Sequence, residues 1–241
     1  MPDLDSDLFQ LAMSEKAQPL MDGVKKHIQE NVVPISEEFF ALEKDKEDRW
    51  SWHPRQLELL DGAKEKAKQS GLWNFFLPDS ELGEGLTNLD YAYIATELGK
   101  VALASETLNC SAPDTGNMEV LERVGTEAQK EKWLKPLLNG EIRSAYAMTE
   151  PGIPSSDAKN ISTQAVLDGD EWVINGEKFY ISGAGDPRCK IMITMVQTDP
   201  DAAPSRKQSQ ILVPTDTPGV EILEGMQVFG QDHAPRGHMH I

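Results

Sequence analysis

Apolar residues recur at helical spacing through the first part of the chain. Leu57 and Leu60 share one face of a segment that Pro54 opens and Gly71 closes. Proline suits the first helical position, and glycine suits the position after the last one. The spacing therefore predicts a helix over residues 54–71.

Further helices are indicated by their ends. One begins near Thr87 or Asn88. Another begins at the capping-box sequence Thr-Glu-Ala-Gln of residues 126–129 and ends at Gly140. An early helix spans about residues 19–46. Pro34 lies inside this helix and predicts a kink or a split, because proline cannot donate the helical hydrogen bond.

After residue 160 the apolar spacing changes to two, which is typical of strands. Strands are predicted over residues 162–167, 171–174, 178–182, 190–198, 209–213, 220–223 and 237–241. Asp168-Gly169 and Asn175-Gly176 are predicted hairpin turns, because both pairs favour positive φ. The strand over 190–198 is apolar on both faces, which indicates burial on both sides.

Helices followed by antiparallel strands predict an α+β chain with two domains. The first is an all-α N-terminal domain over residues 1–144, and the second is an antiparallel β-barrel or sandwich over residues 145–241. The last residues read as a strand that nothing terminates. We therefore expect the β domain to be incomplete at its C-terminal end.

Charge and composition narrow the function. The 241 residues carry a net charge of −17, which argues against binding to nucleic acid or to an anionic membrane surface. No apolar run approaches the length of a membrane span, and the acidic N-terminus is unlike a signal or transit peptide. The two cysteines form no disulfide framework. We expect a cytoplasmic protein, with a mitochondrial or peroxisomal location open for a eukaryotic source.

The histidines near the end of the chain are candidate metal ligands. His233, His238 and His240 are close in sequence, and the last two share one face of the predicted strand. No cysteine or ordered carboxylate completes a ligand set, which favours surface histidines over a metal site. We therefore predict no metal.

Two other segments could bind a cofactor. A short strand over residues 144–148 ends in a loop, residues 149–157, whose prolines, glycine and hydroxyl residues suit a phosphate or a polar heterocycle, or a simple domain linker. In the second segment, Phe179 and Tyr180 are predicted to point to opposite faces of a strand. Ser182 and Gly183 follow them. This set suits the rim of a planar cofactor site, or an ordinary amphipathic strand.

Read together, the two segments resemble the acyl-CoA dehydrogenases. Residues 149–152 and 156–157 match the family loop T-E-P-G-x-G-S-D with one extra residue, and residues 175–182 match its hairpin motif N-G-x-K-x-W-I-T. Residues 109–117 and 181–189 are similar to the large branch that is fused in animals to an aminoglycoside-phosphotransferase-like domain. The resemblance implies three parts: a helical domain, a β domain, and a C-terminal four-helix domain that is absent from these residues.

The resemblance also implies FAD as the cofactor. The implied flavin-binding residues are Tyr146, Met148, Thr149, Ser156, Tyr180 and Ser182. In this reading Tyr180 packs on the flavin, the Ser182 hydroxyl reaches flavin N5, and Ser156 also lies near the pantetheine of the substrate. Asp114 and Asn117 are expected to lie toward the acyl pocket, by position only.

In the family, a carboxylate takes the α-proton of an acyl-CoA thioester and the β-hydrogen leaves as hydride to flavin N5. The family's catalytic glutamate is expected beyond Ile241, and Glu150 is expected to be structural. We therefore expect the isolated chain to be inactive. The implied partners are acyl-CoA, electron-transferring flavoprotein and further copies of the chain in a dimer or tetramer. The alternatives are the flavin- and acyl-CoA-binding half of a split enzyme, and a ligand-free interaction scaffold.

Overall fold

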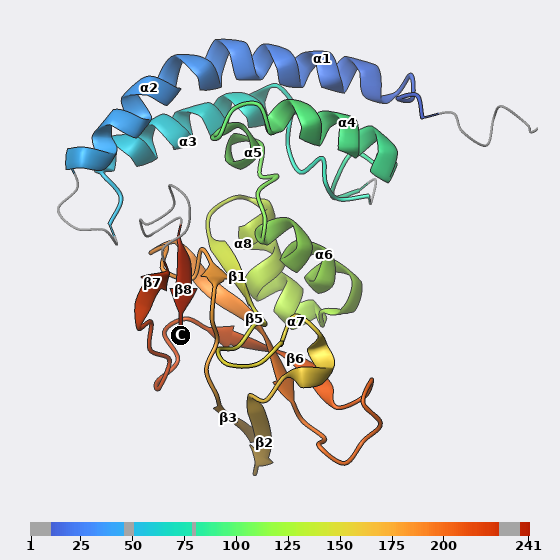
Figure 1. The fold of residues 1–241 in the computed structure, drawn as a ribbon. Helices are drawn as coiled ribbons and strands as arrows, with labels where there is room; N and C mark the ends of the chain where they lie inside the picture. The colour runs from blue at the N-terminus through green and yellow to red at the C-terminus, as the bar shows by residue number, and fades with distance from the viewer. Residues whose placement is uncertain (1–10, 46–50, 79–80, 227–236) are drawn as a thin grey trace, which may run out of the picture. The chain divides into compact units, whose positions relative to one another are not determined.

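The computed structural model describes residues 11–45, 51–78, 81–226 and 237–241. The chain forms two compact units (Figure 1). The helical unit comprises Met1–Asp45 and His53–Ser111, and the sheet unit comprises Lys46–Trp52 and Ala112–Ile241.

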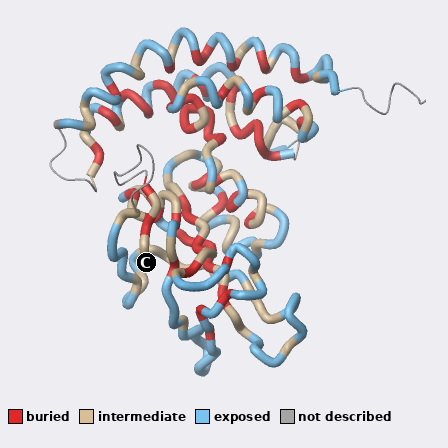
Figure 2. The backbone as a smooth tube through the Cα atoms, viewed as in Figure 1, coloured by how far each residue is buried: buried red, intermediate tan, exposed pale blue. Residues whose placement is uncertain are grey.

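The helical unit is built from α1 (Ala17–His27), α2 (Val33–Ala41), α3 (Pro54–Gln69), α4 (Asn88–Leu98) and α5 (Ala104–Thr107). Figure 2 shows buried and exposed positions alternating along the long helices. The fully buried large side chains of this unit include Phe39, Leu60, Phe75, Ile94 and Leu103. Every helix that the structure describes is too short or too polar to cross a bilayer.

Both prolines inside the predicted helices are preceded by a turn of π-helix. The segment Ile28–Val32 joins α1 to α2 ahead of Pro34, so the early helix is interrupted where the sequence predicts. The same change occurs over Lys130–Leu134 ahead of Pro136, where an unbroken helix was expected. A proline removes one helical donor and crowds the preceding turn, and a wider turn accommodates both effects.

The predicted helix starts are confirmed. His53 caps α3 in a capping box with Gln56, and Pro54 follows at the first position. Thr87 caps α4 in a capping box with Asp90, whose backbone N–H donates to Thr87 Oγ1 at 3.1 Å. Each box satisfies backbone N–H groups that the first turn leaves without a partner.

The sheet unit begins with α6 (Asp114–Val124), α7 (Glu127–Gln129) and α8 (Lys135–Leu138). No helix was predicted at α6. One sheet contains β1 (Arg143–Ala147), β2 (Gln164–Asp168), β3 (Glu171–Asn175), β5 (Cys189–Gln197) and β6 (Gln208–Pro214). The second sheet contains β4 (Ile181–Ser182), β7 (Glu224–Met226) and β8 (His238–His240).

The α+β class with a mostly antiparallel β domain is confirmed, but two pairings are parallel. β1 runs parallel to β5, with Tyr146 opposite Ile193, and β2 meets β5 in parallel at one position. The chain leaves β1 and passes through β2, β3 and β4 before it returns as β5. A connection of that length permits parallel pairing. β5 is buried along most of its length, as predicted.

The predicted turn at Asn175-Gly176 is wrong. β3 pairs only with β2, and the next strand, β4, pairs with β8 in the other sheet. Gly176 has no positive φ; instead, a Cβ built there would lie 2.3 Å from Thr163 Oγ1. Glycine is therefore needed at 176 for close approach. The turn at Asp168-Gly169 is confirmed, with φ of +63° at Gly169.

Two further differences concern the strands. The strand expected over 178–182 is reduced to β4, Ile181–Ser182. The strand expected over 220–223 lies at Glu224–Met226 instead, while the expected strand at the end of the chain is confirmed as β8. The two sheets share one core, which contains Ala145, Ala147, Ile181, Ala184, Cys189, Met192 and Met239. This core identifies the inward-facing side of β1, β4 and β8.

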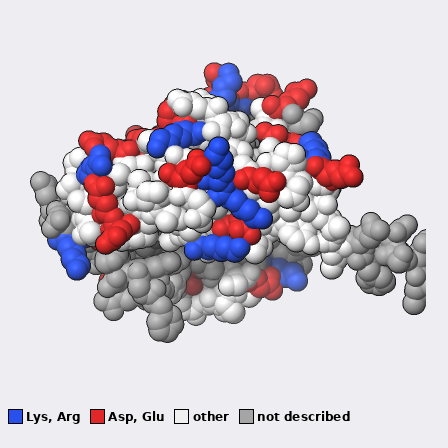
Figure 3. All heavy atoms as spheres, turned by 90° about the horizontal axis from the view of Figure 1, so that it is seen from above, with Lys and Arg blue, Asp and Glu red and all other residues white. Residues whose placement is uncertain are grey.

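On the face shown in Figure 3, basic and acidic side chains are interspersed. Neither sign gathers into one uniform area on that face, although the chain as a whole is strongly acidic.

We predict that Gly176→Ala destabilises the protein by about 1–3 kcal/mol, because the new methyl group overlaps the Thr163 side chain. Gly116→Ala on α6 is the matched control, since a Cβ there meets nothing within 4 Å. Urea unfolding measures both. Equal stability of the Gly176→Ala protein and the wild type would contradict the close approach of Gly176 to Thr163.

Candidate functional site

The loop that follows β1 is organised around the buried carboxylate of Glu150. Glu150 Oε2 accepts from Ser162 N at 2.8 Å and from Ser162 Oγ at 2.6 Å. Glu150 Oε1 accepts from Thr163 N at 2.9 Å and from Thr163 Oγ1 at 2.5 Å. The carboxylate therefore fastens this loop to the start of β2.

Lys178 provides the opposite charge. Its buried ammonium donates to Glu150 Oε1 at 2.8 Å, to the Met148 carbonyl at 3.0 Å and to the Met195 carbonyl at 2.6 Å. All three donor positions of an ammonium group are thus used. The pair ties the end of β1, the start of β2, β5 and the segment before β4 to one point.

The pair shifts the ionisation of both groups. Burial alone raises the pKa of Glu150, but the bonds from Lys178, Ser162 and Thr163 outweigh it and bring the pKa down to about 2. Burial lowers the pKa of Lys178, and the contact with Glu150 opposes that change. A carboxylate so held is a poor proton acceptor at neutral pH. This agrees with a structural role for Glu150.

Several predicted cofactor residues lie on strand faces that point away from the core. Ala145 and Ala147 of β1 face the core, so the side chain of Tyr146 points to the opposite face of the strand. In β4, Ile181 is buried in the core and Ser182 is half-buried on the other side. β1 and β4 are neighbours in the fold.

The loop after β1 and the segment before β4 are joined directly. Phe179 N donates to the Thr149 carbonyl at 2.8 Å, and Thr149 Oγ1 donates to the Phe179 carbonyl. Tyr180 adopts φ of +60° and is 44% exposed. Its ring meets that of Phe179 edge to face at 4.6 Å, so the prediction that the two rings take opposite faces is wrong. The left-handed backbone at Tyr180 breaks the strand alternation.

The structure therefore brings Thr149, Tyr180 and Ser182 to one region, with Tyr146 and Met148 on the adjoining strand end. The Tyr146 hydroxyl accepts from Gln210 Nε2 at 3.0 Å. Ser156 lies exposed further along the loop, whereas the preceding Ser155 is buried and accepts from Glu150 N.

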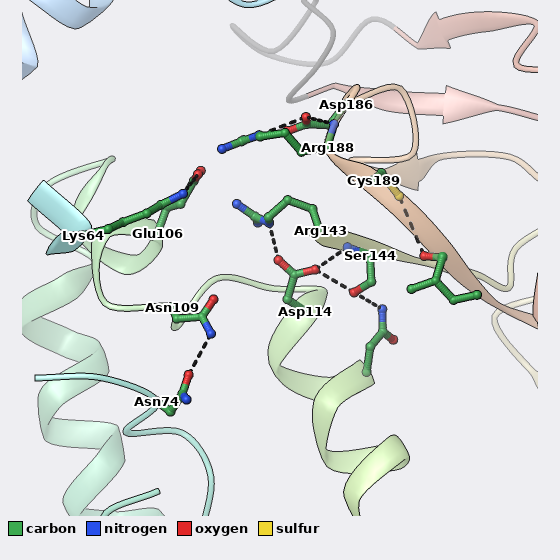
Figure 4. A network of polar contacts seen from close by, with 12 residues as sticks. Lys64, Asn74, Glu106, Asn109, Asp114, Arg143, Ser144, Asp186, Arg188 and Cys189 are labelled. Atoms are coloured by element: carbon green, nitrogen blue, oxygen red, sulfur yellow. Dashed lines mark hydrogen bonds and ion pairs between the residues drawn. The ribbon is translucent and has the colours of Figure 1, made fainter. Parts of the chain in front are cut away.

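Asp114, labelled in Figure 4, and Asn117 both belong to α6 and lie near the start of β1. Both are buried. Asp114 accepts from Ser144 N at 2.7 Å and pairs with Arg143, while Asn117 Nδ2 donates to Ser144 Oγ at 2.8 Å. These bonds fasten α6 to the start of β1. The contact of the two residues with an acyl group stays a prediction.

The histidines of β8 have protein partners. His238 Nδ1 lies 2.7 Å from Ser182 Oγ, and His240 Nε2 contacts Glu177. His233 lies outside the described residues. Within the described part of the chain, no three histidine, cysteine or acidic side chains are grouped for a metal ion.

A groove of about 910 Å³ adjoins this region of the sheet unit. Its lining includes Trp172, Val213, Leu223 and Ile241, together with the pair Glu150 and Lys178. None of the six predicted flavin residues lines it. The candidate cofactor face and the groove are therefore different surfaces.

Comparison with known families agrees with the resemblance that the two sequence motifs indicate. The family model "Acyl-CoA dehydrogenase, N-terminal domain" matches residues 14–141, and "Acyl-CoA dehydrogenase, middle domain" matches residues 145–241. The chain belongs to the acyl-CoA dehydrogenase family. Both motifs lie within the middle-domain match.

Individual relatives in this family are similar over a part of their length. The probable acyl-CoA dehydrogenase FadE2 of Mycobacterium tuberculosis is 54% identical over 185 residues, 76% of this chain and 44% of FadE2. Acyl-CoA dehydrogenase family member 11 of Mus musculus is 45% identical over 244 residues, 99% of this chain and 30% of that protein. The chain thus spans less than half of either curated relative.

A solved structure agrees with the fold. A Mycobacterium abscessus protein assigned to the acyl-CoA dehydrogenases superposes with a TM-score of 0.86 at 44% identity, over 95% of this chain and 57% of that one. The chain therefore has a helical part and a sheet part with the fold found in this family.

Sequence reasoning missed two features of the site. Lys178 was read only as a motif position, although a lysine that interrupts an apolar strand pattern beside a turn-bound glutamate is a signal for a buried ion pair. The contact of His238 with Ser182 joins residues 56 positions apart. No local sequence pattern predicts a contact over that separation.

Removal of one member of the ion pair should be costly. We predict that Lys178→Met and Glu150→Gln each destabilise the protein by about 3–5 kcal/mol, because each leaves polar groups buried without partners. The double variant should lose much less than the sum of the single losses. Urea unfolding of all four proteins measures the coupling. Additive losses would contradict the pairing.

The low pKa of Glu150 also predicts an acid dependence. The folded group has a pKa of about 2 against an ordinary 4.5, so unfolding takes up a proton below pH 4.5. Its contribution is full above pH 4.5 and should fall by roughly 2 kcal/mol between pH 5 and pH 3. The variant that carries both Lys178→Met and Glu150→Gln should not show this acid-dependent part of the loss of stability. An equal acid loss in both proteins would contradict the assignment.

Proposed function

We propose that this chain supplies the flavin-binding face of an FAD-dependent acyl-CoA dehydrogenase. The observation that carries the proposal is the region formed by Thr149, Tyr180 and Ser182, which faces away from the core and is held by the buried pair of Lys178 and Glu150. The family supports the reaction class: α,β-dehydrogenation of an acyl-CoA thioester.

The chemistry of this region suits a flavin. An exposed aromatic ring at Tyr180 offers a flat apolar surface, and the hydroxyls of Thr149 and Ser182 offer hydrogen bonds beside it. Thr149 Oγ1 already donates to the Phe179 carbonyl, so its remaining capacity is to accept from an N–H group of a ligand. None of these three side chains is a carboxylate that would repel phosphate groups. The nearby carboxylate of Glu150 is paired with Lys178.

FAD, when bound, would accept the hydride that leaves the β-carbon of the substrate. The chain's own residues have other tasks in this account. Tyr146 and Met148 form the strand end beside the ring, Tyr180 packs on it, and Ser182 donates toward it. Glu150 holds the loop and takes no proton. We propose that the α-proton goes to a carboxylate other than Glu150.

The remaining assignments belong to the same proposal. Ser156 contacts the cofactor pyrophosphate and the pantetheine, and Asp114 and Asn117 lie toward the acyl group. The boundary between the two family domains is placed at residues 144 and 145, near the point where the two family models meet, whereas the compact units divide between Ser111 and Ala112. Electron-transferring flavoprotein accepts the electrons, the protein is a cytoplasmic homo-oligomer, and fatty-acid β-oxidation is its setting.

The test is flavin binding by the 241-residue chain. We expect FAD absorption retained through desalting, and an affinity at least tenfold weaker in Tyr180→Ala, because an aromatic contact on the ring is lost. Trp172→Ala is the matched control: Trp172 is 46% exposed but lies on β3, at the groove. A colourless protein, or equal losses in both variants, would contradict the proposed site.

A further inference from the structure

The hydroxyl of Ser182 has a partner from the far end of the described chain. β4 and β8 pair antiparallel, and their register sets Ser182 directly opposite His238. Gly183 N donates to the Gly237 carbonyl at 3.1 Å, which extends the pairing by one residue. Ser182 Oγ and His238 Nδ1 are 2.7 Å apart. The register therefore holds the imidazole against the hydroxyl.

The direction of this hydrogen bond decides what Ser182 can do. A serine hydroxyl carries one proton, and a neutral imidazole carries its proton on one of two nitrogens. If Nδ1 accepts, the proton of Ser182 points back into the protein. If Nδ1 donates, Ser182 Oγ accepts, and its own proton is free to reach a third group. A flavin ring nitrogen that accepts a hydrogen bond requires the second arrangement.

We propose that His238 is a positioning residue for the flavin site. It carries its proton on Nδ1, donates to Ser182 Oγ, and turns the Ser182 proton toward the cofactor. This inference rests on the proposed function, in which Ser182 faces the ring. Met239, the neighbour of His238, is fully buried in the core and anchors β8, so the imidazole is held on the outward side.

His240 provides an internal comparison. It lies on the same strand and the same face as His238, two residues further along. Its Nε2 contacts Glu177, and its ring meets Phe179 edge to face at 5.4 Å. No described contact joins it to Ser182. A general effect of changing a β8 histidine should therefore appear equally at both positions, whereas an effect through Ser182 should appear only at 238.

The first experiment measures FAD affinity and the visible spectrum of the bound flavin. We expect His238→Leu and Ser182→Ala each to weaken binding about fivefold, the size of one hydrogen bond, and to shift the flavin bands alike. The double variant should lose no more than either single variant. His238→Asn, whose amide can donate to Ser182, should bind within about twofold of the wild type, and His240→Leu should leave affinity and spectrum unchanged.

Several results would overturn the inference. One is a His238→Leu protein with wild-type affinity and spectrum while Ser182→Ala differs. Another is a double variant whose losses multiply. Equal effects of the substitutions at 238 and 240 would also overturn it. If the wild type itself binds no FAD, the proposed function fails, and the second experiment alone decides the state of His238.

The second experiment needs no cofactor and no folded variant of His238. Long-range proton–nitrogen NMR of the wild-type chain, labelled with ¹⁵N-histidine, identifies the nitrogen that carries the ring proton. We expect the Nδ1–H tautomer at His238 and a change of its Nδ1 shift in Ser182→Ala. An Nε2–H tautomer, with Nδ1 as the acceptor, would overturn the inference.

Discussion

The buried ion pair between Lys178 and Glu150 is the constraint on which the sheet unit depends. Four separate stretches of chain meet at it: the loop after β1, the start of β2, the segment before β4, and β5. Two buried charges are costly to remove from water, and only complete hydrogen bonding offsets that cost. Here the carboxylate accepts five hydrogen bonds and the ammonium donates three.

The candidate cofactor face follows from this arrangement. The loop after β1 and the segment before β4 both contribute to the pair, and the two hydrogen bonds between Thr149 and Phe179 hold them together. The aromatic ring of Tyr180 and the hydroxyl of Ser182 come next along the chain. Their placement on the outward side is set by Ile181, which enters the core between them. The buried ion pair thus helps to position Tyr180 and Ser182 on the outward side.

The sequence predicts the helices, turns and strands better than it predicts which of them pair or contact one another. Four predicted features depend on local chemistry, and the structure confirms them: the helix start near Thr87, the capping box at Thr126, the turn at Asp168-Gly169 and the strand β5, apolar on both faces. At Asn175-Gly176 the glycine serves a close approach to Thr163, a residue outside the motif, and the next strand pairs with the distant β8, so the turn chemistry there was misleading. Likewise, the positive φ of Tyr180 and the contact of His238 with Ser182 arise from packing between distant segments.

The most direct test of the account is a crystal structure of the chain with FAD added. The account predicts electron density for the flavin ring against Tyr180 and Ser182, beside the end of β1. The groove lined by Trp172 and Leu223 should hold no flavin. Density for the ring in that groove, or flavin bound elsewhere while the region of Thr149, Tyr180 and Ser182 stays empty, would contradict the central claim.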